Sequence, residues 1–207
     1  MRKIDPAKHE EKRRQILEAA GRCFVRDGFR GASISDICAE AKISAGHLYH
    51  YFDSKEAIIG AMTEAGLEHA NVRFSHMMKS SNAVSALVAE MERAKVARDR
   101  AGQLIVLDML AEAGRNPAIG DILRQHSREL RTLLADFLRE AQNRGQVDRT
   151  LDADLAAAVL LSVGDGAKAL TIRDPTLDMT RCIDLLKILI ARFLSPPPDS
   201  SPKRARE

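Results

Sequence analysis

The chain has 207 residues, of which 45% are apolar and 29% charged, with a formal net charge of +3. This composition is ordinary for a folded protein and excludes wholesale disorder. No apolar stretch reaches the roughly 18 residues that a membrane span needs, and the charged start MRKIDPAKHEEKRR lacks the apolar segment of a secretory signal. Cys23, Cys38 and Cys182 are odd in number and widely spaced, which argues against a disulfide framework. We therefore expect a cytoplasmic protein with no membrane partner, no metal and no cofactor. The small positive charge is compatible with nucleic acid but does not require it.

Aromatic residues are concentrated at the start of the chain. Tryptophan is absent, and five of the eight aromatic residues lie within the first 52 positions. We therefore expect the N-terminal quarter to form a separate unit with a small aromatic core. The rest of the chain must pack through Leu, Ile, Val, Ala and Met. The five early aromatic residues are Phe24, Phe29, Tyr49, Tyr51 and Phe52.

Apolar residues recur with helical spacing, so we expect an all-α fold of about nine helices. The first helix is predicted over residues 7–27, with Gly28 as its C-terminal cap. Ser33, followed three residues later by Asp36, predicts a capped second helix. Ser44 is expected to cap a third helix over residues 45–52, and Asp53 or Ser54 a fourth helix that reaches about residue 78. Five further helices are predicted over residues 83–98, 104–114, 118–144, 152–171 and 177–194.

Two short helices joined by a tight turn behind a longer helix are typical of a DNA-reading helix-turn-helix. Within the third helix, Leu48 and Phe52 are four residues apart and should point inward. Small residues and polar aromatics are then left on the outside, where they allow close approach to phosphates and base edges. An ordinary solvated surface helix is the alternative. The outward positions are Ala45, Gly46, His47, Tyr49 and His50.

The runs GF, SISDI and ISAGHLYHYFDSKE, between Gly28 and Glu56, resemble the N-terminal domain of TetR-family transcriptional regulators. The resemblance is dense over residues 12–62, and the later helices match the family only in number, length and order. It implies phosphate contacts from Ser33, Tyr49, Tyr51 and Lys55. It also implies base-facing positions at Ala45, Gly46, His47 and His50, with Ser35 reaching the groove. We add Ser44 and Lys42 to this predicted DNA-binding set.

Two positions depart from the family pattern. Lys42 replaces the usual turn glycine, so it bears a strain of about 1 kcal/mol or more if the position needs a positive φ. In return it adds a charge that can contact the DNA backbone. Cys38 replaces a small alanine, and a buried small residue is favoured there over a redox sensor.

The outward face of the third helix lacks Arg, Lys, Asn and Gln, which are the strongest direct readers of bases. Sequence specificity should then depend on histidine, on a contact of Ala45 with a thymine methyl group, and on DNA shape. His47 and His50 have a spacing that can bind metal, but no third ligand lies nearby in the sequence.

Two C-terminal segments, residues 155–163 and 182–194, are apolar on nearly all sides. They must bury a second face, either inside the subunit or against a partner. The resemblance implies the partner, because the last two helices of TetR-like proteins form a four-helix dimer bundle. The predicted interface residues are Leu155, Val159, Leu160, Val163, Gly164, Ala167, Cys182, Leu186, Leu189 and Phe193.

The resemblance also implies a small-molecule effector pocket among the middle helices, although ordinary core packing is the alternative for each methionine there. Asp108, Glu112 and Arg115 form a stripe that we interpret as a solvated face. The predicted pocket residues are Met62, Phe74, Met77, Met91, Met109, His126 and Asp165.

The common enzyme motifs GxSxG, GxxxxGK[ST], GxGxxG and HExxH are absent from the sequence, so no catalytic site is expected. We expect a DNA-binding domain over residues 1–54, an effector-binding and dimerisation domain over 55–194, and a disordered Pro- and Ser-rich basic tail over 195–207. The predicted function is a homodimeric transcriptional regulator, most simply a repressor, that a small molecule releases from a near-palindromic double-stranded DNA operator. The alternatives are an architectural DNA-binding protein without effector control or a small all-α enzyme.

Overall fold

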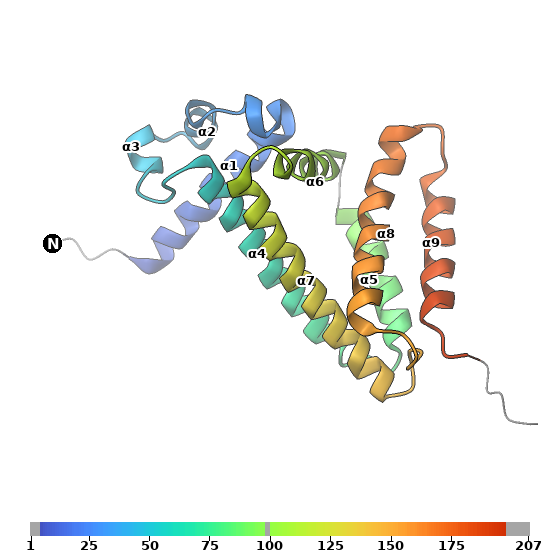
Figure 1. The fold of residues 1–207 in the computed structure, drawn as a ribbon. Coiled ribbons are helices and arrows are strands. Elements are labelled where there is room, and N and C mark those ends of the chain that lie inside the picture. The colour runs from blue at the N-terminus through green and yellow to red at the C-terminus, as the bar shows by residue number, and fades with distance from the viewer. Residues whose placement is uncertain (1–4, 98–99, 198–207) are drawn as a thin grey trace, which may run out of the picture. The chain divides into compact units, whose positions relative to one another are not determined.

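The computed structural model describes residues 5–97 and 100–197. Within these ranges the chain folds into nine α-helices and no strands, which confirms the expected all-α class (Figure 1). Part of the predicted tail, residues 198–207, lies outside the described residues. The helices are α1 (Pro6–Gly31), α2 (Ile34–Ala41), α3 (Ala45–Leu48), α4 (Lys55–Met77), α5 (Ala83–Ala97), α6 (Arg100–Ala113), α7 (Pro117–Asn143), α8 (Ala153–Arg173) and α9 (Met179–Leu194).

Local sequence accounts for both ends of α1. The Asp5 carboxylate accepts a hydrogen bond from the backbone N–H of Ala7, and Pro6 occupies the first turn, where no amide partner is needed. Gly28 has φ of +70°, a conformation that favours glycine, and it interrupts the helix as expected. The chain then resumes a short helical segment, so α1 ends at Gly31 rather than at residue 27.

The third predicted helix is shorter than expected. α3 ends at Leu48, and the chain continues through single turns in which His50 N–H donates to His47 and Tyr51 N–H donates to Leu48. Phe52 still reaches the core, because its own N–H bonds the Leu48 carbonyl. The prediction of a helix over residues 45–52 was therefore wrong in its second half, although the inward positions Leu48 and Phe52 are both buried.

The chain divides into two compact units. The first unit comprises the described residues of Met1–Ala70 and Ala97–Glu129, and the second those of Asn71–Val96 and Leu130–Glu207. This division differs from the expected boundary at residue 54, because the continuous helices α4 and α7 each contribute residues to both units. The expected boundary stays a prediction about function.

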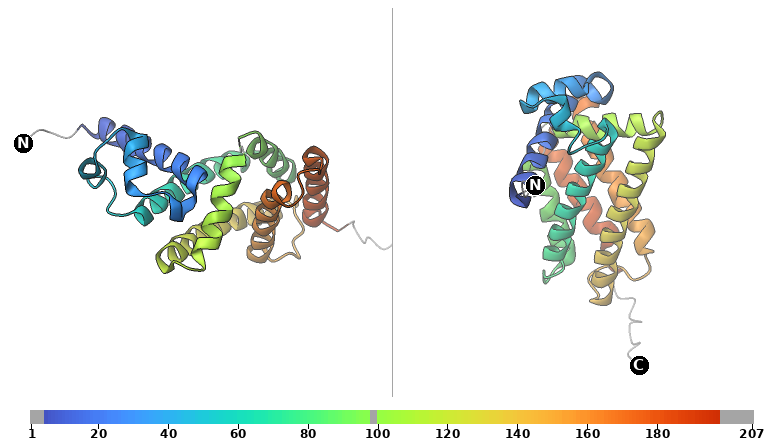
Figure 2. Two further views of the ribbon diagram at one scale, coloured as in Figure 1. Left: turned by 90° about the horizontal axis from the view of Figure 1, so that it is seen from above. Right: turned by 90° about the vertical axis from the view of Figure 1, so that its left-hand side faces the viewer.

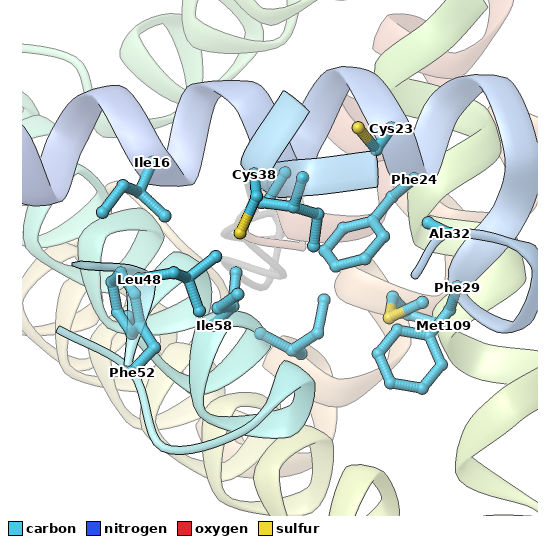
Figure 3. Packing of buried hydrophobic residues seen from close by; sticks show 14 of the residues in the cluster. Ile16, Cys23, Phe24, Phe29, Ala32, Cys38, Leu48, Phe52, Ile58 and Met109 are labelled. Carbon is cyan, nitrogen blue, oxygen red and sulfur yellow. The ribbon is translucent and has the colours of Figure 1, made fainter. Parts of the chain in front are cut away.

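The first unit has a core that contains aromatic residues from the start of the chain. In Figure 3, Leu48 and Phe52 lie near Ile58, while Phe24 and Phe29 lie near Met109. The Phe24 and Phe29 ring centroids are 5.6 Å apart. Figure 2 shows α2 and α3 grouped with α1, and buried residues of all three helices, such as Phe24, Ile37 and Leu48, belong to this core.

The second unit is packed largely with aliphatic side chains. Its core includes Leu134, Leu138, Leu160 and Leu194, and Phe137 lies 6.0 Å from Phe74 between ring centroids. Figures 1 and 2 show α9 running beside α8. Across the part of the chain that the structure describes, no helix combines the length and apolar character needed to cross a membrane.

Candidate nucleic-acid interface

The short helix α3 is held by caps at its own start and by the core at its end. The Ser44 hydroxyl accepts a hydrogen bond from the His47 N–H at 3.2 Å, as the sequence predicted. Leu48 is fully buried, which fixes the rotation of α3 against the first unit. The opposite face of α3 is therefore presented to solvent in a defined orientation.

Most of the predicted DNA-binding residues lie on the surface of the first unit. Only Tyr51 and Lys55 are half-buried, and each has a physical reason described below. The exposed residues are Ser33, Ser35, Lys42, Ser44, Ala45, Gly46, His47, Tyr49 and His50.

The Lys55 ammonium is bound to the protein itself. Its Nζ donates to the carbonyl oxygens of Phe29 at 2.5 Å and Ala32 at 2.9 Å, and it lies 4.3 Å from the centroid of the Phe29 ring. These contacts satisfy backbone acceptors where α1 ends and α2 begins. Lys55 thus joins the start of α4 to the support of the helix-turn-helix, a role that sequence reasoning missed.

Lys42 adopts the conformation that its position in the turn suggested. Its φ and ψ are +54° and +49°, and it is the one described non-glycine residue with a positive φ. Ile43 N–H donates to the Cys38 carbonyl at 3.0 Å, which completes the hydrogen-bond pattern of a glycine-type helix terminus. Among the described residues, no hydrogen bond or ion pair holds the exposed Lys42 ammonium. The residue therefore combines backbone strain with a solvent-exposed cation.

Ser33 and Asp36 form the expected capping box of α2. The Asp36 N–H donates to Ser33 Oγ at 3.1 Å, and the Ser33 N–H donates to the Asp36 carboxylate at 2.8 Å. The Ser33 hydroxyl and then its backbone N–H hold the pKa of the Asp36 carboxyl below its usual range. The start of α2 is therefore stabilised before any DNA is present.

Tyr51 is half-buried because aromatic rings surround it. The His9 ring from the second turn of α1 stacks on it, with centroids 4.6 Å apart and planes inclined by 25°. The His47 ring of α3 is tilted against it at 5.6 Å. Sequence reasoning did not include His9, since nothing in the local pattern connects it to a residue 42 positions away.

Two carboxylates of α6 accept hydrogen bonds from the C-terminal end of α1. The Asp108 carboxylate accepts the Phe29 N–H at 2.6 Å, directly after Gly28, whose positive φ interrupts the helix. Glu112 accepts from Arg30 Nε at 2.9 Å and is only 6% exposed. The interpretation of Asp108 and Glu112 as a solvated face was therefore wrong, because both carboxylates bond α1 across the first unit.

Two of the three cysteines lie in the core of the first unit. Cys23 and Cys38 are buried, and burial raises the pKa of both thiols, so they favour the unreactive protonated form. Within the described ranges, no three His, Cys, Asp or Glu residues are grouped closely enough to hold a metal ion.

The predicted effector residues divide between the two hydrophobic clusters. Met109 is buried in the core of the first unit and Met62 packs against it, whereas Met77 is buried in the second core and Phe74 packs against that. His126 belongs to the first unit and Asp165 to the second. The Met91 side chain lies outside the described residues. As a pocket, this set stays a prediction.

The predicted dimer residues do not all share one environment. Leu155, Val159 and Leu189 are 67%, 50% and 52% exposed, whereas Leu160 is 7% exposed and belongs to the second core. Leu160 points into the second core while Leu155 and Val159 point outward, so Leu160 is not part of the exposed face. Phe193 packs partly against the same core. The half-buried members of the set are Val163, Gly164, Ala167, Cys182 and Leu186.

Two family models match the chain. Residues 16–62 match bacterial regulatory proteins of the tetR family, and residues 82–195, more than half of the chain, match the C-terminal domain of BetI-type transcriptional repressors. The chain belongs to the TetR family of transcriptional regulators. The resemblance drawn from the sequence is thereby confirmed, and the protein is a DNA-binding repressor rather than an enzyme.

Named relatives agree with this membership. The transcriptional regulator UidR of Escherichia coli strain K12 is 31% identical over 158 residues, which cover 76% of this chain and 80% of UidR. The nicotine-responsive repressor HdnoR of Paenarthrobacter nicotinovorans is 26% identical over 80% of this chain and 86% of HdnoR. Among solved structures, Salmonella enterica GusR has a TM-score of 0.75 with 28% identity, covering 89% of this chain and 95% of GusR. UidR and HdnoR are thus similar to this chain in sequence, and GusR is similar to it in fold.

Proposed function

We propose that two copies of this chain form a cytoplasmic repressor dimer that binds a near-palindromic DNA operator through α3 and releases it when a small molecule binds the C-terminal domain. The observation that carries this proposal is the outward face of α3. Its residues are small or polar, they are exposed in a fixed orientation, and the segment 42–52 contains no Asp or Glu that would repel phosphate. We assign direct base contacts to Ala45, Gly46, His47 and His50.

The phosphate contacts are proposed for the rim of this surface. Tyr49 is 51% exposed, and Lys42 carries an exposed ammonium beside α3. Ser33, Ser35 and Ser44 add exposed hydroxyls at the starts of α2 and α3. Lys55 is better supported as an indirect contributor, because its ammonium is already bonded to two backbone carbonyls.

Sequence selection from random DNA duplexes tests the operator proposal. Two-fold symmetry of the protein requires two similar half-sites whose centres are about 34–36 Å apart, or a multiple of this spacing. We expect the selected duplexes to share an inverted repeat with that spacing. Recovery of many unrelated sequences with equal affinity would contradict this proposal and support an architectural DNA-binding protein.

The dimer is proposed from exposed apolar side chains on α8 and α9. Leu155 and Val159 lie one helical turn apart on α8, and Leu185, Ile188 and Leu189 are 66%, 48% and 52% exposed on α9. An apolar surface of this kind on two adjacent helices is typical of a protein–protein interface. Leu185 and Ile188 were absent from the predicted set, and their exposure adds them to the proposed interface.

Light scattering tests this interface with a matched pair of variants. Leu189→Glu places a charge on the proposed interface without disturbing the core, so we expect a folded monomer with much weaker operator binding. Val72→Glu changes an exposed apolar residue, 70% accessible, on α4, which is not one of the two helices of the proposed interface, and it should remain a dimer. A stable monomer of the parent protein at micromolar concentration would contradict the proposal.

The effector signal is proposed to reach the helix-turn-helix through α6. Asp108 and Glu112 bind the Phe29 N–H and the Arg30 side chain, so a displacement of α6 acts directly on the end of α1. Thermal-shift screening of small molecules identifies the effector, because a ligand of the folded state raises the melting temperature. In Asp108→Ala, we expect the ligand to keep its thermal shift but to lower operator affinity less than in the parent. An unchanged effect on operator affinity would contradict this route.

A further inference from the structure

The His9 ring stacks on Tyr51 beside the proposed DNA-binding face, and His9 lies on a part of α1 that the family model does not reach. That model begins at residue 16, whereas His9 lies in the second turn of α1. The flanking residues Lys8 and Glu10 are exposed, but His9 is half-buried against Tyr51. The contact therefore gives this otherwise exposed stretch of α1 a defined attachment to the segment that follows α3.

Tyr51 is held from two sides and keeps its polar end available. Its N–H donates to the Leu48 carbonyl at 2.9 Å, and its ring packs against the core of the first unit. His9 and His47 contact the same ring from α1 and α3. Within the described part of the chain, no hydrogen bond involves the Tyr51 hydroxyl. The phenol is thus positioned by its ring while its oxygen remains a donor for an external acceptor.

We propose that His9 is a positioning residue of the DNA-binding surface, which holds the Tyr51 ring so that its hydroxyl meets a phosphate of the DNA backbone. This inference rests on the proposed function and adds the second turn of α1 to the surface. The recognised ligand is the phosphate oxygen, so the effect should be similar for all DNA sequences. His9 acts through the orientation of Tyr51, and any aromatic ring of similar size should replace it.

Tyrosine fluorescence gives a direct readout of the stack. The chain has no tryptophan and only two tyrosines, so Tyr49→Phe leaves Tyr51 as the single fluorophore. In that background, we expect His9→Ala to change the intensity and lower the anisotropy of Tyr51, and His9→Phe to retain the anisotropy of the parent ring. An unchanged Tyr51 signal after His9→Ala would show that the rings do not stack in solution and would overturn the proposal.

Binding to a mixed-sequence DNA duplex tests the functional consequence and needs no known operator. A stacked aromatic pair corresponds to about three- to tenfold in affinity. We therefore expect His9→Ala to weaken binding by about that factor, and His9→Phe to restore most of the loss. His76→Ala, an exposed histidine of α4 in the second unit, is the matched control and should bind as the parent does.

A double-mutant cycle separates positioning from a general loss of structure. In Tyr51→Phe the hydroxyl is absent, so His9→Ala should have little further effect on DNA affinity if it acts only through that hydroxyl. Equal losses in both backgrounds, or failure of His9→Phe to restore binding, would overturn the proposal. Absence of DNA binding by the parent protein would instead contradict the proposed function as a whole, so the two failures are distinguishable.

Discussion

The two units of this molecule expose different kinds of side chain, although polar contacts tie distant segments in both, in the second unit through Gln146 and Arg144. In the first unit, polar contacts tie segments that are distant in sequence, such as Lys55 to Phe29 and Arg30 to Glu112. In the second unit, α8 and α9 cover an aliphatic core while leaving apolar side chains such as Leu155 and Leu189 exposed. A DNA-binding surface needs hydrogen-bond donors in fixed positions, whereas a dimer surface needs apolar side chains that are exposed in the single subunit. The comparison teaches that a polar exposed helix face and an apolar exposed helix face can be supported by two separate cores in one short chain.

Substitutions on the buried and exposed faces of α8 should give the largest difference in the free energy of unfolding. Leu160→Ala removes a buried side chain from the second core, so we expect a loss of about 2–4 kcal/mol in the free energy of unfolding. Leu155→Ala should leave the core unchanged and act on the dimer alone. Urea unfolding at two protein concentrations distinguishes the effects, because the midpoint of a dimer rises with protein concentration. Leu160→Ala should lower the midpoint at both concentrations, whereas Leu155→Ala should reduce its dependence on concentration. Equal, concentration-independent losses for both variants would contradict the difference between the two faces.

The polar ties of the first unit are tested at Lys55. Lys55→Met keeps the length of the side chain but removes the donor to the Phe29 and Ala32 carbonyls, so we expect a loss of about 1.5–3 kcal/mol in the free energy of unfolding. Thermal or urea unfolding without DNA measures this loss. A variant that unfolds like the parent, but whose DNA affinity depends on salt with a slope smaller by about one unit, would show instead that Lys55 contacts phosphate.

Substitution of Lys42 is expected to stabilise the protein and to weaken its binding to DNA. Lys42→Gly relieves the positive φ of +54°, which should stabilise the free protein by about 1 kcal/mol. It also removes an exposed cation beside α3, so DNA binding should weaken similarly on all sequences. Lys42→Asn is the control, since asparagine tolerates this backbone conformation and also lacks the charge. Lower stability in Lys42→Gly would contradict the expected backbone strain at Lys42. Unchanged DNA affinity in both variants would contradict the expected contribution of its charge to DNA binding.

The capping box of α2 gives the smallest expected effect and has a definite pH dependence. Ser33 lowers the pKa of the Asp36 carboxyl in the folded state, so the ionised form stabilises the protein at neutral pH. The pKa of a free aspartate is about 3.9, and the pKa of Asp36 in the folded protein lies below it. The contribution should therefore decrease as the pH falls below about 3.9 and disappear once the pH has passed through the lowered pKa. We expect the parent to be more stable than Asp36→Asn at pH 7 and the difference to vanish in acid. Urea unfolding at both pH values checks this, and a difference that grew on acidification would be contrary to the expected sign.

Short-range features were the part of the fold and site that the sequence could predict. The break at Gly28, the Ser33–Asp36 cap, the Ser44 cap and the strained Lys42 all depend on residues within a few positions of one another. Apolar spacing also predicted the all-α fold and the inward direction of Leu48. These features are set by backbone sterics and local hydrogen bonds, which sequence spacing describes directly.

Contacts between distant segments could not be predicted from the sequence. His9 and Tyr51 are 42 positions apart, and Arg30 and Glu112 are 82 positions apart. The family resemblance assigned Lys55 to phosphate, yet in the folded chain its ammonium donates to the carbonyl oxygens of Phe29 and Ala32. The early end of α3 at Leu48 was missed for a related reason, because the segment 49–52 is shaped by the core below it rather than by its helical pattern.

Gly46 provides the most direct test of DNA binding through α3. A Cβ atom added there would meet no atom of another element within 4 Å, and Gly46 is exposed, so Gly46→Glu should fold normally and place a negative charge in the centre of the exposed face. We expect this variant to keep the melting temperature and dimeric state of the parent while losing detectable binding to the selected operator, and Val72→Glu to bind normally. Parent-like affinity of Gly46→Glu for that operator would contradict the assignment of α3 as the DNA-reading helix.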